Sequence, residues 1–353
     1  MKSVFIGVFK PIKSSVCLSS ILNLASLKAE NMVMKNPKPK GLLTGTATLR
    51  NPFGKTSIEF SGVADSFSLD GRYMGDVNLE ADASLTSGLV NFEAHARDSA
   101  YDFDLAGSYN YKDSANTLGI NLEGRKIDLQ VLEPYLGAIF GDITGTATTS
   151  LKVSGTPKHL YLTGEALIDS ASLFVSYTQC RYNIKDETIY FRPDEIDLGR
   201  MIIKDTIGNE GVVSGRMSHT FFEKFSFHNL SLETQRMLLL NTTRKDNEDF
   251  YGNVIGYAKM TLDGPITGMV MNIDGQPSSI DSSHLYLPTG SSKESSTIDY
   301  IEFIQFGTPA KERNRSEVAN ILVNLNVNAN PACRVDVILD EATGDILHGQ
   351  GNG

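Results

Sequence analysis

The chain has 353 residues, of which 21% are charged, and its formal net charge is −10 at pH 7. This acidic balance argues against the basic surface that binds nucleic acid, so we expect no nucleic-acid partner. The cysteines stand at positions 17, 180 and 333, which is too scattered for a C-x-x-C metal or redox pair. No run of apolar residues reaches the ~18 that a membrane-spanning helix requires.

Residues 1–40 show no sustained pattern. The early apolar run Val4–Phe9 is stopped by Lys10 and Pro11, so it is too short for the apolar part of a signal peptide. Residues 36–41 (NPKPKG) have the composition of a connector, and a regular alternation begins directly after them. We therefore interpret residues 1–40 as an N-terminal segment and connector that precedes the repetitive part of the chain.

Residues 41–126 alternate between apolar and polar side chains, which indicates β-strands. A two-residue turn at Ser87-Gly88 would place Leu85 opposite Val90, and a second turn at Asp98-Ser99 would place Ala96 opposite Tyr101. In this register every apolar residue of three strands meets another apolar residue. The pattern predicts an antiparallel β-meander with one apolar and one polar face.

The second part of the chain continues this alternation after one predicted short helix at residues 127–138, which Pro134 and Gly137 keep short. We predict a turn at Asp169-Ser170. We predict another at Gly264-Pro265 that pairs Leu262 with Thr267, so that Met260 faces Met269 and Ala258 faces Met271. Residues 275–298 are rich in Ser, Gly and Pro and are predicted to form an exposed loop.

Roughly twenty predicted strands without a helical layer indicate an all-β fold with a long, mainly antiparallel sheet. Such a sheet covers its apolar face by forming a sandwich, a barrel or a long trough. Small residues on facing strands favour an open groove, although a filled sandwich core remains the alternative. The residues expected to line a groove for lipid or a client protein are Val77, Leu79, Ala81, Ala83, Leu85, Val90, Phe92, Ala94, Ala96, Phe103, Leu105, Ala258, Met260, Met269 and Met271.

Several stretches resemble the C-terminal region of the translocation and assembly module TamB family, within the AsmA-like group. They are SGTPKHLYLTGEALIDSASLFVSYTQCRYNIKDETIYF (154–191), KDTIGNEGVVSGRMSH (204–219), MLLLNTTRKDNEDFYGNVIGYAKMTLDGPITGMVMNIDG (237–275) and VNLNVNANPACRVDVILDEATGDILHGQGNG (323–353). They follow one another in the family's order, and the resemblance covers about residues 127–353. The residues that match its motifs are Gly155, Thr156, Phe250, Tyr251, Gly252, Gly264 and Pro265.

The resemblance implies a U-shaped β-trough (a β-taco) with an apolar interior, similar to the bridge-like lipid transfer proteins. Family members are anchored in the inner membrane and reach across the periplasm of Gram-negative bacteria to an outer-membrane β-barrel of the TamA or BamA type. Their implied role is outer-membrane biogenesis: assembly of outer-membrane proteins and autotransporters, protein secretion, and transport of phospholipid along the trough. The family is longer and carries an N-terminal anchor that this sequence lacks, so we expect a fragment of a periplasmic protein.

The reactive side chains predict neither an enzyme nor a cofactor site. The six histidines are dispersed, without the spacing of a zinc motif. The acidic residues Asp336, Asp340, Glu341 and Asp345 do not follow the alternation of a calcium loop, so we expect no metal.

Two further classes of protein stay open. The asparagines Asn324, Asn326 and Asn328 could form a ladder on a polar face, or they could indicate a parallel β-helix like those of polysaccharide-degrading enzymes. A surface adhesin or glycan-binding β-sandwich is the other alternative. It would require a filled core and exposed aromatic side chains on loops.

Overall fold

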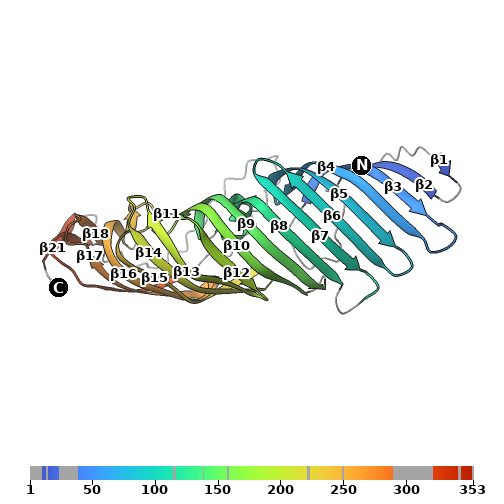
Figure 1. Ribbon diagram of the computed structural model, residues 1–353. Coiled ribbons are helices and arrows are strands. Elements are labelled where there is room, and N and C mark those ends of the chain that lie inside the picture. The colour runs from blue at the N-terminus through green and yellow to red at the C-terminus, as the bar shows by residue number, and fades with distance from the viewer. Residues whose placement is uncertain are drawn as a thin grey trace.

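The computed structural model describes residues 10–12, 15–23, 39–113, 117–137, 139–156, 159–220, 223–248, 250–288, 321–340 and 343–351. These residues form a single sheet of strands β1 to β21, which confirms the predicted all-β class. The strands lie side by side along an elongated molecule, with β1 at one end and β21 at the other (Figure 1). The sheet is antiparallel along most of its length, as expected for a meander.

The first part of the sheet is a continuous meander of neighbouring strands. Its strands are β1 (Lys10–Ile12), β2 (Ser15–Asn23), β3 (Pro39–Arg50), β4 (Ser57–Leu69), β5 (Arg72–Ser84), β6 (Leu89–Arg97), β7 (Tyr101–Asn110), β8 (Leu118–Asp128), β9 (Phe140–Thr156) and β10 (His159–Val175). Strands β1 and β2 fall within the stretch interpreted as an N-terminal segment, and β2 pairs with β3.

The second part contains β11 (Cys180–Ile184), β12 (Glu187–Arg192), β13 (Glu195–Asp205), β14 (Glu210–Thr220), β15 (Glu223–Thr242), β16 (Tyr251–Pro265), β17 (Met269–Pro277), β18 (Ser283–Pro288), β19 (Ile321–Val327), β20 (Cys333–Asp340) and β21 (Asp345–Gln350). The short strands β11 and β12 pair with successive parts of the long strand β10. At the C-terminal end β16 pairs with both β17 and β18, and these two strands pair in parallel with β19 and β20.

The predicted hairpin registers are wrong by an even number of residues. Val90 lies opposite Ala83 rather than Leu85, because residues 85–88 form a longer turn in which the Gly88 amide donates to the Ser84 carbonyl at 2.8 Å. Phe103, not Tyr101, lies opposite Ala96. Because side chains alternate with period two, an even shift leaves each residue on its predicted face.

The hairpin at Gly264-Pro265 is also longer than predicted. Leu262 pairs with Met271 instead of Thr267, because β16 continues to Pro265 and a 3₁₀ turn, η3 (Ile266–Gly268), makes the connection. Met260 therefore faces Ile273, and Ala258 faces Gly275.

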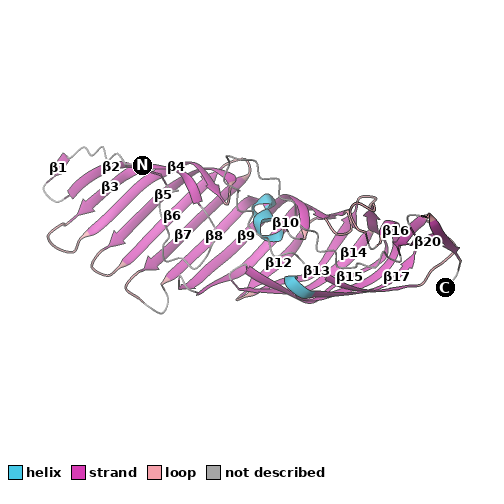
Figure 2. Ribbon diagram, turned by 180° about the vertical axis from the view of Figure 1, so that it is seen from behind, coloured by secondary structure: helices cyan, strands magenta, loops and turns pink. Residues whose placement is uncertain are grey.

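Three other local predictions need correction. Asp169-Ser170 is not a turn, because β10 runs through it with a bulge between Ile168 and Ser170. The helix predicted at 127–138 is limited to the 3₁₀ turn η2 (Leu129–Leu132) and the single turn α1 (Glu133–Leu136), drawn in cyan in Figure 2. Asp128 caps it by accepting a hydrogen bond from the Gln130 amide at 2.9 Å.

The exposed loop predicted at 275–298 is interrupted by β18, because Ser283 and Leu285 are buried there against the neighbouring strands. Residues 289–298 of that prediction lie outside the described residues. Of the two alternatives for the asparagines, a polar ladder is present at Asn324 and Asn326 between the parallel strands β17 and β19. Asn324 donates to the side chain of Asn272 at 2.9 Å, and Asn326 donates to Asp274 at 3.0 Å.

The buried apolar side chains form separate clusters along the sheet instead of one central core. The first packs around Ala64, Val77 and Phe103 in β4 to β7. A second centres on Ile143, Cys180 and Met237, and a third joins Phe227 to Met269. The clusters are separate because the molecule is elongated, so the apolar side chains of each group of strands pack only against those of nearby strands.

Candidate functional site: the apolar face of the sheet

One face of the sheet carries apolar side chains in rows that cross many strands. In the first row, Val77 of β5 lies opposite Ala96 of β6, which lies opposite Phe103 of β7. In a row nearer the middle of the strands, Ala81 lies opposite Phe92, which lies opposite Gly107. The predicted lining residues other than Leu85 occupy this face of their strands.

Burial on this face falls toward the turn at residues 85–88 that joins β5 to β6. Val77, Ala96 and Phe103 are 4%, 0% and 7% exposed and belong to the first core cluster. By contrast, Ala81 and Ala83 of β5, Phe92 of β6 and Leu105 of β7 are only half-buried. In β5 to β7 the apolar face is thus packed around Val77, Ala96 and Phe103 and more accessible toward the β5–β6 turn.

Large rings on this face lie against glycines of neighbouring strands. A Cβ atom on Gly107 would lie 2.7 Å from the Phe92 ring, and one on Gly45 would lie 2.7 Å from the Phe60 ring. These rings occupy the space that a side chain would fill at the glycines.

Leu85 was predicted to line the groove, but it lies beyond the end of β5 in the following turn and is 43% exposed. This is a correction that follows from the longer turn. In the C-terminal part, Ala258 and Met269 are buried, whereas Met260 and Met271 are half-buried. Met260 lies between Leu232 and Ile273, so the apolar face continues from β15 to β17.

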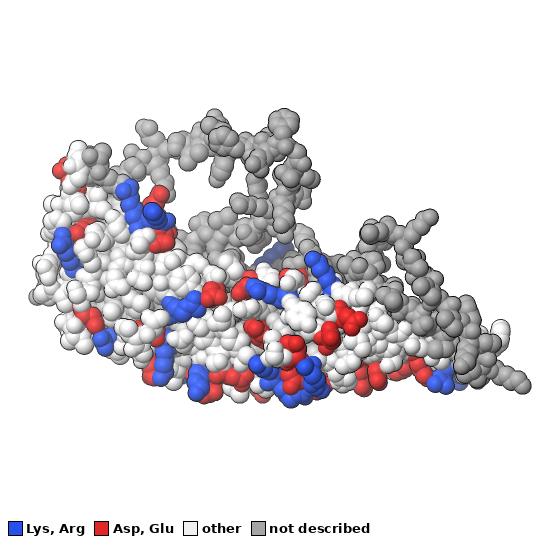
Figure 3. All heavy atoms as spheres, turned by 90° about the horizontal axis from the view of Figure 1, so that it is seen from above, with Lys and Arg blue, Asp and Glu red and all other residues white. Residues whose placement is uncertain are grey.

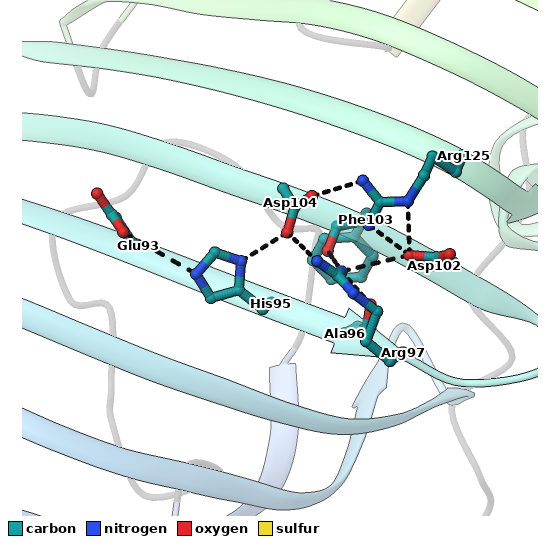
Figure 4. A network of polar contacts seen from close by, with 8 residues as sticks. All are labelled: Glu93, His95, Ala96, Arg97, Asp102, Phe103, Asp104 and Arg125. Carbon is teal, nitrogen blue, oxygen red and sulfur yellow. Dashed lines mark hydrogen bonds and ion pairs between the residues drawn. The ribbon is translucent and has the colours of Figure 1, made fainter.

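The opposite face is polar and carries ion pairs. Asp104 accepts hydrogen bonds from Arg97 and from Arg125, and its Oδ1 lies 2.6 Å from His95 Nδ1 (Figure 4). Arg125 also donates to Asp102 at 2.6 Å. Hydrogen bonds from the two arginines hold the pKa of Asp104 well below its usual value, and those to Asp102 and Asp104 raise the pKa of Arg125. His95 of β6 is thus part of this network.

On the surface seen in Figure 3, basic and acidic side chains are interspersed rather than gathered into a field of one sign. Oppositely charged side chains also pair across neighbouring strands, as Arg192 does with Asp197 at 2.9 Å. This mixed surface offers no extended basic stripe for a polyanion on the side that the view shows.

The seven residues on which the resemblance was based occupy strand ends and close backbone contacts. Gly252 has a φ of 146°, and a Cβ atom there would lie 2.0 Å from the His284 carbonyl oxygen, so only glycine fits. Tyr251 stacks on Tyr286 with 4.8 Å between ring centroids, and Phe250 contacts Tyr177 edge-on. Gly155 and Thr156 end β9, while Gly264 and Pro265 end β16.

Two polar arrangements were not found from the sequence. Asp336 is buried between Arg334 of its own strand β20, His348 of the following strand β21 and His284 of β18, which is 52 residues away in sequence. A polar hollow also lies where strand bulges meet on β13 to β15. Neither has a sequence signal, because each depends on which strands become neighbours.

No cluster of His, Cys, Asp and Glu side chains with the arrangement of a metal site occurs within the described residues. In the same part of the chain, no helix combines the length and apolar character needed to cross a bilayer. Comparison with models of protein families, with curated proteins and with solved structures finds no match to this chain.

Proposed function

We propose that the sheet is curved into a U-shaped trough whose apolar face holds or conducts lipid acyl chains, or shelters apolar strands of a client outer-membrane protein. The observation that carries this proposal is the half-buried part of the apolar face, which includes Ala81 and Phe92 and, farther along the sheet, Met260 and Met271. An acyl chain that covers such a face gains about 0.8 kcal/mol for each CH₂ removed from water.

The shape of the molecule supports this assignment. A sandwich would bury its apolar face against a second layer, whereas here the described strands form one elongated sheet. The ring of Phe92 fills the space beside Gly107 on this face. An apolar face suits flexible chains without a fixed register, because binding then needs contact area more than specific polar groups.

The proposed cellular location and partners rest on the resemblance to the TamB family. We assign the chain to a periplasmic protein that acts in outer-membrane biogenesis, with a parent anchored in the inner membrane and a barrel partner of the TamA or BamA type. The motif residues Gly252 and Gly264 occupy positions with positive φ. Because glycine adopts positive φ more readily than other residues, this backbone conformation explains why glycine occupies positions 252 and 264.

The test is native mass spectrometry of phospholipid that co-purifies with the chain expressed in a Gram-negative host. Ala83 lies on the half-buried part of the apolar face between Ile58 and Val90. Ala83→Asp places a charge in the path of an acyl chain, so we expect bound phospholipid to be lost. The control is Asn78→Asp, which adds the same charge to the exposed polar face of the same strand.

Retention of phospholipid by a folded Ala83→Asp protein would contradict the proposal that acyl chains occupy the apolar face. If the wild-type chain purifies without lipid, lipid transport is contradicted and the sheltering of protein strands is the remaining function. Photo-crosslinking from residue 83 to an unfolded outer-membrane protein would test that function. Crosslinks to neither lipid nor protein would favour the glycan-binding alternative.

A further inference from the structure

Three bulges lie side by side on the polar face of the C-terminal half. In the pairing of β13 with β14, the register shifts between Asp197 and Arg200. The pairing of β14 with β15 shifts between Ser214 and Arg216, and that of β15 with β16 shifts between Phe227 and Leu230. Gly215 is thereby flanked by two residues on each neighbouring strand. Aligned bulges of this kind bend the strands and redirect side chains, often beside binding sites.

The bulges contain residues with left-handed backbone conformations. Gly199, Gly215 and Asn229 have φ values of 59°, 137° and 48°. A Cβ atom on Gly215 would lie 2.5 Å from Leu230 Cα, so no other residue fits there. Together these residues form the floor of a hollow of about 490 Å³, whose walls include Asp197, Ser214, Arg216 and His228.

The walls of the hollow present both hydrogen-bond donors and acceptors, and their acidic and basic side chains balance in charge. Asp197 offers carboxylate acceptors and pairs with Arg192 at 2.9 Å. Arg216 offers donors, and its guanidinium is held only loosely by Glu195 at 3.7 Å. His228 Nε2 lies 2.7 Å from the Ser218 hydroxyl oxygen. The acidic and basic groups are matched, so the hollow does not have the excess positive charge that an anion requires.

The backbone amides of the bulges are already occupied. The Gly199 amide donates to Asp197 at 2.9 Å, and the Asn229 amide donates to Asp263 at 2.7 Å. These amides therefore do not form an open nest for phosphate, which needs several free N–H groups pointing at one centre.

An exposed aromatic ring stands at the margin of the hollow. Tyr190 lies opposite Asp197 on β12 and is 43% exposed. Its ring lies 3.8 Å from where a Cβ atom on Gly199 would stand, so the glycine leaves the ring open on that side. An aromatic surface beside a Ser, Asp, Arg and His set offers both an apolar platform and paired polar contacts.

We propose that this hollow binds a saccharide. A sugar ring carries hydroxyl groups that each donate and accept, and its C–H face packs on an aromatic ring. Asp197 would accept from hydroxyl groups, Arg216 would donate to them, and His228 and Ser214 would do either. The volume of about 490 Å³ suits one or two sugar units. The site lies on the polar face and is independent of the proposed use of the apolar face.

Saturation-transfer NMR on the full chain tests this proposal, with glucose, galactose and N-acetylglucosamine as separate probes, and ³¹P line broadening follows the binding of inorganic phosphate. We expect transfer to at least one sugar and no broadening of the phosphate signal. Arg216→Gln and His228→Ala should each weaken sugar binding by roughly tenfold, which corresponds to one lost hydrogen bond to a charged or polar group. Lys259→Gln is the control, because Lys259 is exposed on the same face of β16 and outside the hollow.

The absence of transfer to all three sugars would overturn the proposal, and so would binding of phosphate alone, which would indicate an anion site. Sugar binding unchanged in both Arg216→Gln and His228→Ala would place the saccharide elsewhere and equally overturn it. Arg216 and His228 are exposed, so both variants should keep the melting temperature of the parent chain.

Discussion

His284 Nε2 lies 2.9 Å from Oδ2 of Asp336, a carboxylate whose side chain is only 3% exposed. The other carboxylate oxygen of Asp336 is 2.9 Å from Arg334 Nε and 2.7 Å from His348 Nδ1. One buried side chain of β20 thus joins β18 on one side and β21 on the other. Because β18 and β20 pair in parallel and are far apart in sequence, this contact ties the C-terminal strands to the rest of the sheet.

Replacement of this carboxylate should destabilise the C-terminal end of the sheet. Asp336→Asn leaves Arg334 and two histidines without a charged acceptor, so we expect a loss of about 1–3 kcal/mol in the free energy of unfolding at neutral pH. Urea unfolding followed by circular dichroism measures it. The exposed Asp82→Asn is the control. Equal stability of the two variants would contradict a structural role for Asp336.

The same carboxylate predicts a loss of stability in acid. Burial acts to raise the pKa of Asp336, but the hydrogen bonds from Arg334, His348 and His284 outweigh it and lower the pKa below 3.8. A folded-state pKa below the unfolded value stabilises the fold above the unfolded pKa, and this contribution is lost as the pH falls toward the folded value. We expect the acid decline of stability to be shallower in Asp336→Asn, in urea titrations repeated from neutral pH downward.

Because the Phe92 ring lies against Gly107, alanine substitutions at Gly107 and at Gly119 on the adjacent strand should differ in their effect on stability. A Cβ atom on Gly107 would also meet the Gly119 carbonyl oxygen at 2.8 Å, so Gly107→Ala must displace both a ring and backbone. We expect a loss of about 1–3 kcal/mol in thermal or urea unfolding. A Cβ atom on Gly119 meets nothing within 4 Å, and Gly119→Ala should leave stability unchanged or slightly raised. Equal effects of the two substitutions would show that the ring does not cover Gly107.

The network around Asp104 predicts a salt-dependent contribution from the polar face. Its arginines are about half exposed, so solvent and salt screen the ion pairs. We expect Asp104→Asn to lower the melting temperature slightly in dilute buffer, and the difference from the parent chain should shrink as salt is added. A difference that persists in molar salt would mean that Asp104 acts through packing instead of charge.

Cys180 should resist alkylation in the folded protein. Its side chain is 1% exposed, and burial raises the pKa of the thiol to about 11, so little thiolate forms near pH 8. Iodoacetamide labelling followed by peptide mass spectrometry should detect Cys180 modification only slowly, and rapidly after unfolding in urea. Fast labelling of the native chain would show that the cluster around Cys180 opens readily.

The sequence predicted the faces of the strands better than their pairing. Ala81, Phe92 and Leu105 lie on one face as the alternation indicated, but the opposite residues differ from the expected ones. Turn length was the source of error. Ser87-Gly88 has the composition of a two-residue turn, whereas the Gly88 amide bonds to Ser84 and makes the turn longer.

Bulges were not visible in the sequence for a related reason. Asp169-Ser170 has the composition of a turn, yet β9 on one side and the strands β11 and β12 on the other hold it within a continuous strand. Likewise, nothing near Gly199, Gly215 or Asn229 indicated that their bulges would align. A bulge is a property of two paired strands, so one sequence segment does not reveal it.

What the sequence by itself determined is the all-β class and the division of each strand into an apolar and a polar face, because side-chain alternation is local and has a fixed period. Tertiary structure alone decided which strands became neighbours across long separations. It brought His284 to Asp336 and aligned the bulges at Gly215. These arrangements depend on hydrogen bonding between distant strands and on how much of each face its neighbours cover, and no local pattern carries that information.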